Sequence, residues 1–512
     1  MLRLNLELFL FARTTMYRSL GRDSSLQRDH FLHCRLWSLV FTLGVLFAAT
    51  AWAAPAPEAP PLNAQLEPII KRDLPPNCAL TLQMVDLESG RILMEKNPDL
   101  ALIPASTMKV ITSAAALKTL KPNFTFVTEI LADGVRGGSV GNLFVKGSGD
   151  PYLVSEELFA LTRGLKDKGL QEIRGNIVLD DSYFRPEPPL DENEKLGTRS
   201  YHAPYSALSL NFNSIKLLVQ PAARSGEDAQ ISLDPVSEYS IVKAKVKTVK
   251  GSKPAQVEIT KRATRDGREI IRLDGVIGAQ APVWRRYVNV ALPSLYFGEV
   301  FKEFLLREGI RVIGKVECGK VPQSADLYYE FKSLPLGQIV YWLDKFSNNF
   351  MAEQIGMAMG AKVHGAPGTR EKGLAVIRKY LLSCGVPEAN FSLSEASGLS
   401  RNNHVSASTL VHVLVAASRD FTYNAEYTAS FGVSGVDGTL KKKFTDPGMK
   451  RRIRAKTGTL RGVNALAGYG LSASGRTFAF AVIVNCLEKG TGLIDYGDRI
   501  VSSIMRLPAF RK

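Results

Sequence analysis

The chain has 512 residues, of which 45% are hydrophobic and 22% are charged, and its formal net charge is +16. This composition is typical of a globular protein and excludes disorder or a collagen-like repeat as the overall class. A chain of this length exceeds one ordinary hydrophobic core, so we expect two or three domains.

Residues 36–54 form an uncharged apolar segment that follows Arg35. The segment ends near Ala51-Trp52-Ala53, a small-x-small cleavage pattern, so we predict a secretory signal peptide over residues 1–53. A membrane-spanning anchor is the alternative, because about 19 apolar residues are enough to cross a bilayer. The residues before the apolar segment are many for a signal peptide, which favours a translation start at Met16.

Four cysteines follow the predicted signal peptide: Cys78, Cys318, Cys384 and Cys486. Export would place them in an oxidising compartment, where disulfides form. The sequence allows three pairings and does not choose among them, and Cys486, which ends an apolar run, could equally be a buried free thiol. No C-x-x-C occurs, so neither a zinc ribbon nor a thioredoxin-type motif is indicated.

Alternation and punctuation along the chain predict its main elements. A β-hairpin is expected over residues 78–97, with its turn at Glu88-Ser89-Gly90, and a helix over residues 106–120. Residues 123–325 change to short strands separated by Gly, Pro and Asp, which indicates inserted β-rich material. The later elements are expected to be helices over 334–363 and 406–418, strands over 452–460, 464–472 and 476–486, and a last helix over 496–507. One sheet could thus be assembled from both ends of the chain, with helices on its faces, in an α/β (α+β) domain.

A basic stretch, residues 243–272, holds ten basic residues against Glu258, Asp266 and Glu269. Basic and apolar residues alternate there as in a strand with one solvated face, so a charged surface is the first interpretation. Binding to an anionic envelope polymer or a membrane surface is the alternative. Removal of residues 1–53 would leave a net charge of about +13.

Ser106 and Lys109 form an S-x-x-K pair at the start of the helix expected over 106–120. Residues three apart share one face of a helix, so the two side chains can meet, and the helix N-terminus favours developing negative charge. A second S-x-x-K, Ser240 and Lys243, lies in a predicted strand, which directs residues three apart to opposite faces. Only the first pair therefore suits a nucleophile with its own base.

A lysine can serve as a base only if its pKa falls well below about 10.4. A second ammonium group about 4 Å away would lower that pKa by roughly 3 units at an effective dielectric constant of about 20. Lys456 is the candidate, because it begins the one K-T-G of the chain, residues 456–458. The same strand would offer the backbone N–H of Thr459 to an oxyanion.

A Ser-x-Asn sequence would suit proton relay and substrate binding, and the chain has three of them: Ser209/Asn211, Ser347/Asn349 and Ser400/Asn402. Such pairs usually form caps and turns. Ser347 differs because it interrupts two helical apolar runs, where a polar S-N-N is unexpected unless it is used.

S-T-M-K, S-N-N and K-T-G in this order resemble the motifs of the penicillin-interacting serine hydrolases. The interval from Ser106 to Ser347 is much longer than in simple β-lactamases. In this respect the chain is similar to the D-alanyl-D-alanine carboxypeptidase/endopeptidase family, the class C low-molecular-mass penicillin-binding proteins of the DacB type. Other stretches support the resemblance, among them "VKGSGDPYL", "SALSLNFN", "SGLSRNN" and "GVDGTL". One departure is Glu395-Ala396, where the family usually has Asp-Gly before Ser397.

The resemblance implies a β-lactamase/transpeptidase-like catalytic domain with β-rich domains inserted between the S-x-x-K and S-x-N motifs. The implied catalytic domain comprises residues 54–122 and 325–512. Inserted domain II comprises residues 123–215 and 290–324, and nested domain III comprises residues 216–289.

The implied function is that of a periplasmic serine peptidase that cleaves peptidoglycan stem peptides and is acylated by β-lactams, without cofactor or metal. Its site residues by this resemblance are catalytic Ser106, Lys109 and Ser347, an oxyanion hole at Ser106 and Thr459, and substrate-binding Asn349, Lys456, Thr457, Gly458 and Thr459. Nucleic acid is not an expected partner. The sequence does not choose between carboxypeptidase and endopeptidase activity, nor does it indicate an oligomeric state.

Two other functions remain as alternatives, a serine β-lactamase and a catalytically silent peptidoglycan-binding or sensor protein. A complete proton-transfer set argues against a silent protein. A Ser-His-Asp hydrolase is disfavoured because G-x-S-x-G is absent, and neither H-E-x-x-H nor a Walker A sequence occurs.

Overall fold

The computed structural model describes residues 62–186, 198–486 and 492–511. The predicted signal peptide, residues 1–53, lies outside these ranges. Within them, no helix combines the length and the apolar character needed to cross a membrane.

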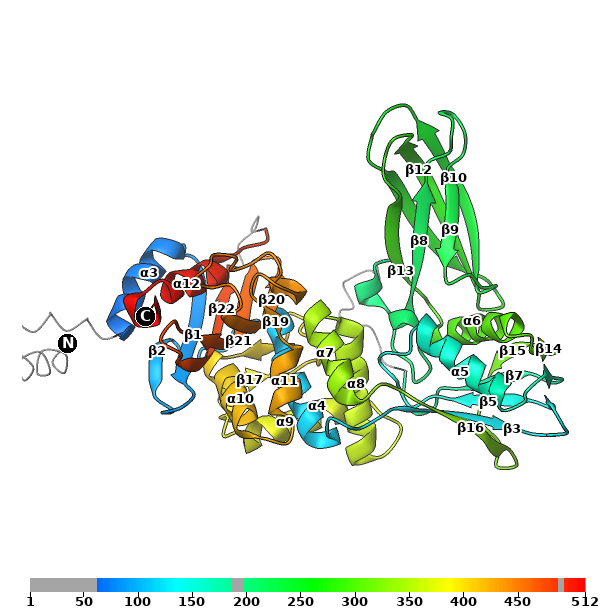
Figure 1. Ribbon diagram of the computed structural model, residues 1–512, viewed down its shortest axis with the longest axis horizontal. Helices are drawn as coiled ribbons and strands as arrows, with labels where there is room; N and C mark the ends of the chain where they lie inside the picture. The colour runs from blue at the N-terminus through cyan, green and yellow to red at the C-terminus, as the bar shows by residue number, and fades with distance from the viewer. Residues whose placement is uncertain (1–61, 187–197, 487–491, 512) are drawn as a thin grey trace, which may run out of the picture. The chain divides into compact units, whose positions relative to one another are not determined.

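A six-stranded antiparallel sheet forms the centre of the first part of the fold (Figure 1). Its order is β19-β20-β21-β22-β1-β2, so strands from both ends of the chain meet where β22 pairs with β1. The bounds are β1 Ala79–Asp86, β2 Ile92–Lys96, β19 Gly432–Val433, β20 Ile453–Leu460, β21 Val463–Leu471 and β22 Thr477–Asn485. The predicted hairpin, the three late strands and their union in one sheet are confirmed.

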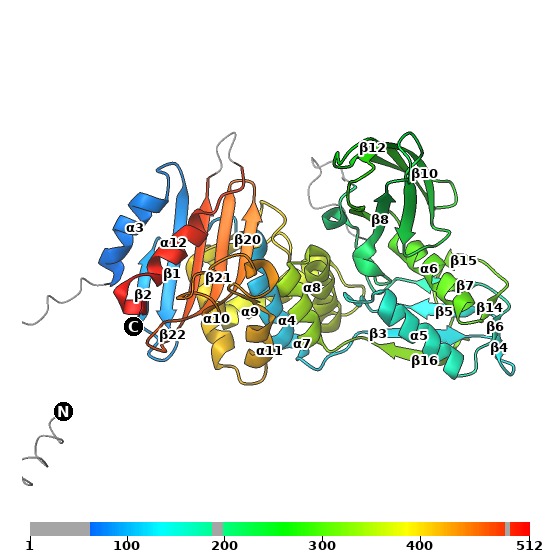
Figure 2. The same cartoon turned by 45° about the horizontal axis from the view of Figure 1, so that its top comes forward.

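Helices cover both faces of this sheet because its strands are apolar on both sides. Ala465, Ala481 and Ile483 point into a core shared with α4, α7, α8, α9 and α10. Leu466, Phe480 and Val482 point into a second core with α3 and α12, which lie side by side in Figures 1 and 2. The helices are α3 Leu66–Asp73, α4 Met108–Leu120, α7 Leu336–Phe346, α8 Asn349–His364, α9 Arg370–Ser383, α10 Ala407–Arg419, α11 Asn424–Ser430, α12 Tyr496–Met505 and α13 Pro508–Arg511.

The material between α4 and α7 is rich in strands, as predicted, and has its own apolar core. A five-stranded sheet, β15-β7-β5-β3-β16, and a three-stranded sheet, β14-β6-β4, pack with helices α5 and α6. Their bounds are β3 Val127–Ala132, β4 Ser139–Val140, β5 Leu143–Lys146, α5 Ser155–Asp167, β6 Glu172–Ile173, β7 Ile177–Asp180, α6 Pro293–Arg307, β14 Arg311–Val312, β15 Val316–Cys318 and β16 Asp326–Lys332.

Two further three-stranded sheets occupy the middle of this insertion, β13-β8-β9 and β10-β12-β11 (Figure 2). They comprise β8 Ser214–Gln220, β9 Gln230–Asp234, β10 Ser240–Val249, β11 Gln256–Ala263, β12 Glu269–Gly278 and β13 Trp284–Asn289. A short ladder pairs β17 Phe391–Ser392 with β18 His404–Val405. Because β16 pairs with β3, the inserted sheet extends past residue 325; the domain boundaries stay a prediction.

The basic stretch forms β10, β11 and β12, and its alternation matches a half-solvated sheet. Lys243, Lys245 and Lys247 of β10 are exposed, whereas Val246 is buried between them. Lys245 lies in one row with Asp274 and Glu258 of the neighbouring strands, so part of its charge is compensated within the sheet. Binding of an anionic partner stays a prediction.

One disulfide, Cys78–Cys486, closes the end of the sheet where β1 and β22 pair. The sequence left three pairings open, and this one leaves Cys318 and Cys384 as free thiols. The bridge ties residues 408 positions apart in sequence.

Candidate active site

The S-x-x-K pair lies where a 3₁₀ turn, η2 Ala105–Thr107, leads into α4. Lys109 Nζ is 3.1 Å from Ser106 Oγ, as the spacing on one helix face requires. Lys109 is fully buried, whereas Ser106 is partly exposed, so the hydroxyl is open to a substrate. The preceding Ala105 has φ +47°, a left-handed conformation that non-glycine residues seldom adopt.

The S-N-N motif joins two helices beside this pair. Ser347 ends α7 in the left-handed region, with φ +57°, and Asn349 begins α8. The Asn349 Oδ1 atom accepts a hydrogen bond of 2.7 Å from Lys109 Nζ. Lys456 Nζ donates to Ser347 Oγ at 2.8 Å and to the Thr457 carbonyl at 2.7 Å. The structure therefore brings all three motifs together in one site.

Burial is the largest cause of the lowered pKa values of both lysines. It lowers the pKa of Lys109 to about 8, although nearby carboxylates, chiefly that of Glu395 and then that of Asp344, act in the opposite direction. Burial, and then the positive charge of Lys109, lower the pKa of Lys456 to about 7. The sequence argument attributed a lowered pKa of Lys109 to repulsion by Lys456. In the structure, repulsion is the second cause for Lys456 and is not among the causes for Lys109.

The open edge of β20 faces the turn that holds Ser106. Ile453 O accepts from Ser434 N beside β19, whereas Arg452 O accepts from Leu471 N beside β21. Backbone groups alternate along a strand, so those of Thr457 and Thr459 point to the β19 side. Strand β19 pairs only with Arg454 and Ala455, which leaves this edge open beyond them.

Gly458 lets β20 lie against the η2 turn. A Cβ atom at this position would be 2.6 Å from Pro104 O and 3.1 Å from Thr107 N. The Thr457 hydroxyl donates to Thr439 Oγ1 at 2.8 Å, and the Thr459 side chain is exposed. The K-T-G strand is thus placed by a contact that only a glycine allows.

Sequence reasoning missed Asp344, a fully buried carboxyl group at the end of α7. Ser113 and Ser430 each donate to its Oδ2 atom at 2.9 Å. Burial raises the pKa of Asp344 to about 6, while the positive charges of Lys456 and Lys109 oppose the rise. An Asp on the apolar side of a helix just before S-N-N was the signal that could have identified it.

Sequence reasoning also missed the Ser397 carbonyl, which accepts a hydrogen bond of 2.5 Å from Lys109 Nζ. Ser397 belongs to the stretch Glu395–Gly398, quoted above only as part of the resemblance. Gly398 has φ +79°, and a Cβ there would be 1.9 Å from Ala105 O. This loop therefore contacts both the nucleophile turn and the lysine.

The other candidate pairs have structural roles. Ser240 and Lys243 lie in strand β10, as expected. Asn211 Oδ1 accepts from Ser155 N at the start of α5, and Ser400 Oγ accepts from Asn402 N within a turn. Among the described residues, no group of three His, Cys, Asp or Glu side chains could hold a metal ion.

Residues 62–498 match the D-Ala-D-Ala carboxypeptidase 3 (S13) family. A D-alanyl-D-alanine carboxypeptidase of Actinomadura sp. (strain R39) is 32% identical over 422 residues, which cover 78% of this chain and 77% of the relative. The chain belongs to this carboxypeptidase family. The predicted family is confirmed, and so is the prediction of a carboxypeptidase-type enzyme; the serine nucleophile stays a prediction.

A sequence and a crystal structure from Haemophilus influenzae are also similar to this chain. The D-alanyl-D-alanine carboxypeptidase DacB of that organism is 27% identical over 417 residues, covering 79% of this chain and 85% of the relative. The crystal structure of its penicillin binding protein 4 (dacB) superimposes with a TM-score of 0.74, covering 87% of this chain and 99% of that one at 24% identity. This likeness confirms the predicted fold class.

Proposed function

We propose that this protein is an exported serine D-Ala-D-Ala carboxypeptidase/endopeptidase that acts on peptidoglycan stem peptides through an acyl-enzyme at Ser106. One observation carries the proposal: a buried lysine whose pKa is lowered to about 8 lies 3.1 Å from a partly exposed serine hydroxyl. A lysine in that state can take the hydroxyl proton near neutral pH.

In the acylation step, Ser106 Oγ attacks the peptide carbonyl carbon while Lys109 takes its proton. The C–N bond then breaks, and the leaving amine receives a proton. The hydrogen bond between Lys456 and Ser347 places a hydroxyl that can pass this proton on, which is the relay role expected for Ser347. Water afterwards attacks the ester carbonyl, and Ser106 recovers its proton as the acid product leaves.

Substrate binding is assigned to Asn349 and to the strand that begins with Lys456. A stem peptide ends in a carboxylate, which Lys456 and the exposed Thr459 hydroxyl could bind with charge-assisted hydrogen bonds. The backbone N–H groups of Ser106 and Thr459 would receive the oxyanion, and the open edge of β20 supports this assignment. Thr457, by its hydrogen bond to Thr439, and Gly458, by its close contact with the η2 turn, would keep strand β20 next to Ser106.

A bound carboxylate also decides which lysine acts as base. Lys456 has the lower pKa of the two lysines, and an anion beside it would stabilise its protonated form. The neutral member of the pair is then Lys109, the one in contact with Ser106.

Export is supported by the disulfide Cys78–Cys486, since such bonds persist in oxidising compartments. We therefore propose a periplasmic location and a signal peptide over residues 1–53. Expression of the full chain and N-terminal sequencing of the mature protein test this; an N-terminus that retains residue 36 would contradict it.

The deciding experiment tests the purified protein with benzylpenicillin and, separately, with peptidoglycan stem peptides. We expect benzylpenicillin to add its mass to the peptide that contains Ser106, and Ser106→Ala to remain unlabelled. We also expect release of D-Ala from a pentapeptide or cleavage of a D-Ala-diaminopimelate cross-link. Fast penicillin turnover without muropeptide cleavage would favour a β-lactamase. Stable labelling with no cleavage would favour a sensor.

A further inference from the structure

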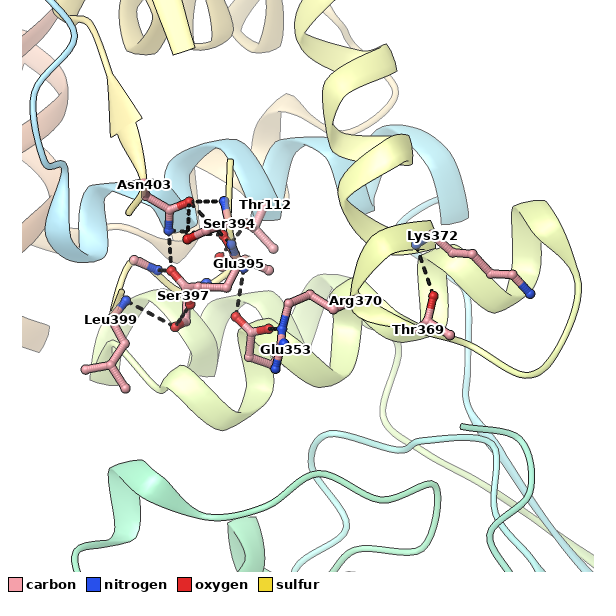
Figure 3. A network of polar contacts seen from close by, with 12 residues as sticks. Thr112, Glu353, Thr369, Arg370, Lys372, Ser394, Glu395, Ser397, Leu399 and Asn403 are labelled. Carbon is pink, nitrogen blue, oxygen red and sulfur yellow. Dashed lines mark hydrogen bonds and ion pairs between the residues drawn. The ribbon is translucent and has the colours of Figure 1, made fainter. Parts of the chain in front are cut away.

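Two buried carboxyl groups, those of Glu353 and Glu395, lie close to Lys109, and the proposed mechanism uses neither of them. Glu353 is on α8, one turn after Asn349, and Glu395 is in the loop 394–399 that follows β17 (Figure 3). Their exposed fractions are 2% and 0%. Buried carboxyl groups are costly unless their hydrogen bonds are satisfied, so the network around them carries information.

Glu395 accepts hydrogen bonds on both oxygens. Oε2 accepts from Ser397 N at 2.9 Å and from Ser397 Oγ. Oε1 accepts from Gly398 N at 2.5 Å and from Asn403 Nδ2. Four N–H or O–H groups therefore lie within hydrogen-bonding distance of the two oxygens, which are the acceptor atoms of a carboxylate. Three of these partners are N–H groups, which can only donate, so the hydrogen-bond pattern favours the ionised form of Glu395.

Glu353 is different, because its neighbour is an acceptor. Its Oε1 atom accepts from Ala396 N at 2.7 Å, and the negative charge of Glu395 lies close enough to act on it. Two neighbouring buried carboxyl groups do not ionise together readily, and the N–H donors around Glu395 favour the charge on that member of the pair. Burial and the charge of Glu395 raise the pKa of Glu353 well above its ordinary value, which agrees with a neutral Glu353.

The other groups that face the pair leave this assignment intact. Arg370 Nε of α9 is 3.9 Å from Glu353 Oε2, and its positive charge lowers the pKa of Glu353 by less than burial and the charge of Glu395 raise it. Tyr205, from the inserted part, is partly buried, and loss of hydration raises its pKa, so it stays neutral. Lys109 of α4 is a further cation near the pair, and the negative charge of Glu395 raises its pKa against the effect of burial.

The loop connects this charge to the reacting groups. Ser397 binds Glu395 through its N–H and hydroxyl, while its carbonyl accepts from Lys109 Nζ at 2.5 Å. Thr112 of α4 fastens the same loop by donating to Ala396 O at 2.6 Å. Displacement of Glu395 would therefore move the Ser397 carbonyl, and with it the Lys109 amine that donates a hydrogen bond to that carbonyl.

We propose that Glu395 is a positioning residue for acylation: as an anion, with Glu353 as its neutral partner, it holds the Ser397 carbonyl against Lys109 and keeps that lysine basic enough to act at near-neutral pH. The inference rests on the proposed function, in which Lys109 is the base. Burial alone would make the amine a weaker base, and a base works best when its pKa lies near the working pH.

The test measures the rate of acylation by benzylpenicillin against pH in the full chain. On the acid side of the pH–rate profile, the rate falls as Lys109 becomes protonated, and we call this fall the acid limb. Glu395→Gln removes an anion that favours protonated Lys109, so the acid limb should move to lower pH by roughly half a unit or more. Because the Ser397 carbonyl would also lose its support, the maximal rate should fall by at least about tenfold. Glu395→Asp, the residue that the family usually has here, should return the limb to its wild-type position. Glu353→Gln should keep the limb where wild type has it, whatever its effect on rate.

The control is Glu371→Gln, the same substitution at an exposed position of α9, which should change neither rate nor limb. A limb that stays in place in Glu395→Gln, or moves in Glu353→Gln, would overturn the assignment. If Glu395→Gln fails to fold, infrared spectroscopy decides: wild type should show a buried protonated carboxylic acid band that Glu353→Gln lacks, and its absence from wild type would overturn the pair. If wild type is not acylated, the proposed function fails, while the infrared test still applies to the pair.

Discussion

Gly458→Ala should slow acylation because the added methyl group meets backbone atoms that have little freedom to move. Its Cβ would be 2.6 Å from Pro104 O, about 0.8 Å inside an ordinary contact. Strand β20 and the η2 turn must therefore separate by that amount. Because a misplacement of about 1 Å can cost about 10²-fold in rate, we expect acylation by benzylpenicillin to fall by about 10- to 100-fold.

Stopped-flow acylation of the purified variant measures this effect, with a melting curve as the check on folding. Overpacking should also destabilise the protein by about 1–3 kcal/mol. Gly448→Ala is the matched control, because a Cβ there meets nothing within 4 Å and should change neither quantity. A folded Gly458→Ala protein that acylates within about threefold of wild type would refute the idea that this contact sets the geometry.

Three further predictions concern the lysines and the disulfide. Lys109→Ala should keep the fold but lose acylation by at least about 100-fold, measured by labelling rates; near-normal labelling would assign the base elsewhere. Acylation should fall as the pH drops through about 8, where Lys109 becomes protonated, and Asp344→Asn should move that fall to lower pH because the Asp344 charge raises the pKa values of both lysines; an unmoved pH profile would contradict this. Cys78→Ser should lower the free energy of unfolding by about 2–4 kcal/mol in denaturant titrations, whereas the exposed free thiol Cys318 should tolerate the same change; equal effects would deny the bridge a stabilising role.

The sequence predicted the catalytic sheet well because its signals are local or periodic. Alternation located the hairpin, and strand signals located the late strands, including the apolar run of residues 476–486. The S-x-x-K pair followed from helix geometry alone. The assembly of β1 beside β22 could be expected because strands at both ends of the chain needed partners.

The buried carboxyl groups near Lys109 could not be predicted in the same way. Asp344, Glu353 and Glu395 lie far apart in sequence, and each is an ordinary polar residue until the fold buries it. Their effect on Lys109 depends on burial and on donors from other segments, such as the N–H groups of the 394–399 loop, which no local pattern encodes. For the same reason the disulfide partner of Cys78 stayed open.

Several features that destabilise the fold lie next to the proposed nucleophile. Ala105 and Ser347 adopt left-handed conformations beside the two reacting centres, and each such non-glycine residue costs about 1–3 kcal/mol. Two lysines are fully buried, so each loses hydration that its charged form would have in water. A fold selected only for stability would avoid all four features. Their joint presence around one serine hydroxyl is explained if the protein needs a neutral amine and a fixed hydroxyl in contact, which is the requirement of lysine-assisted acyl transfer.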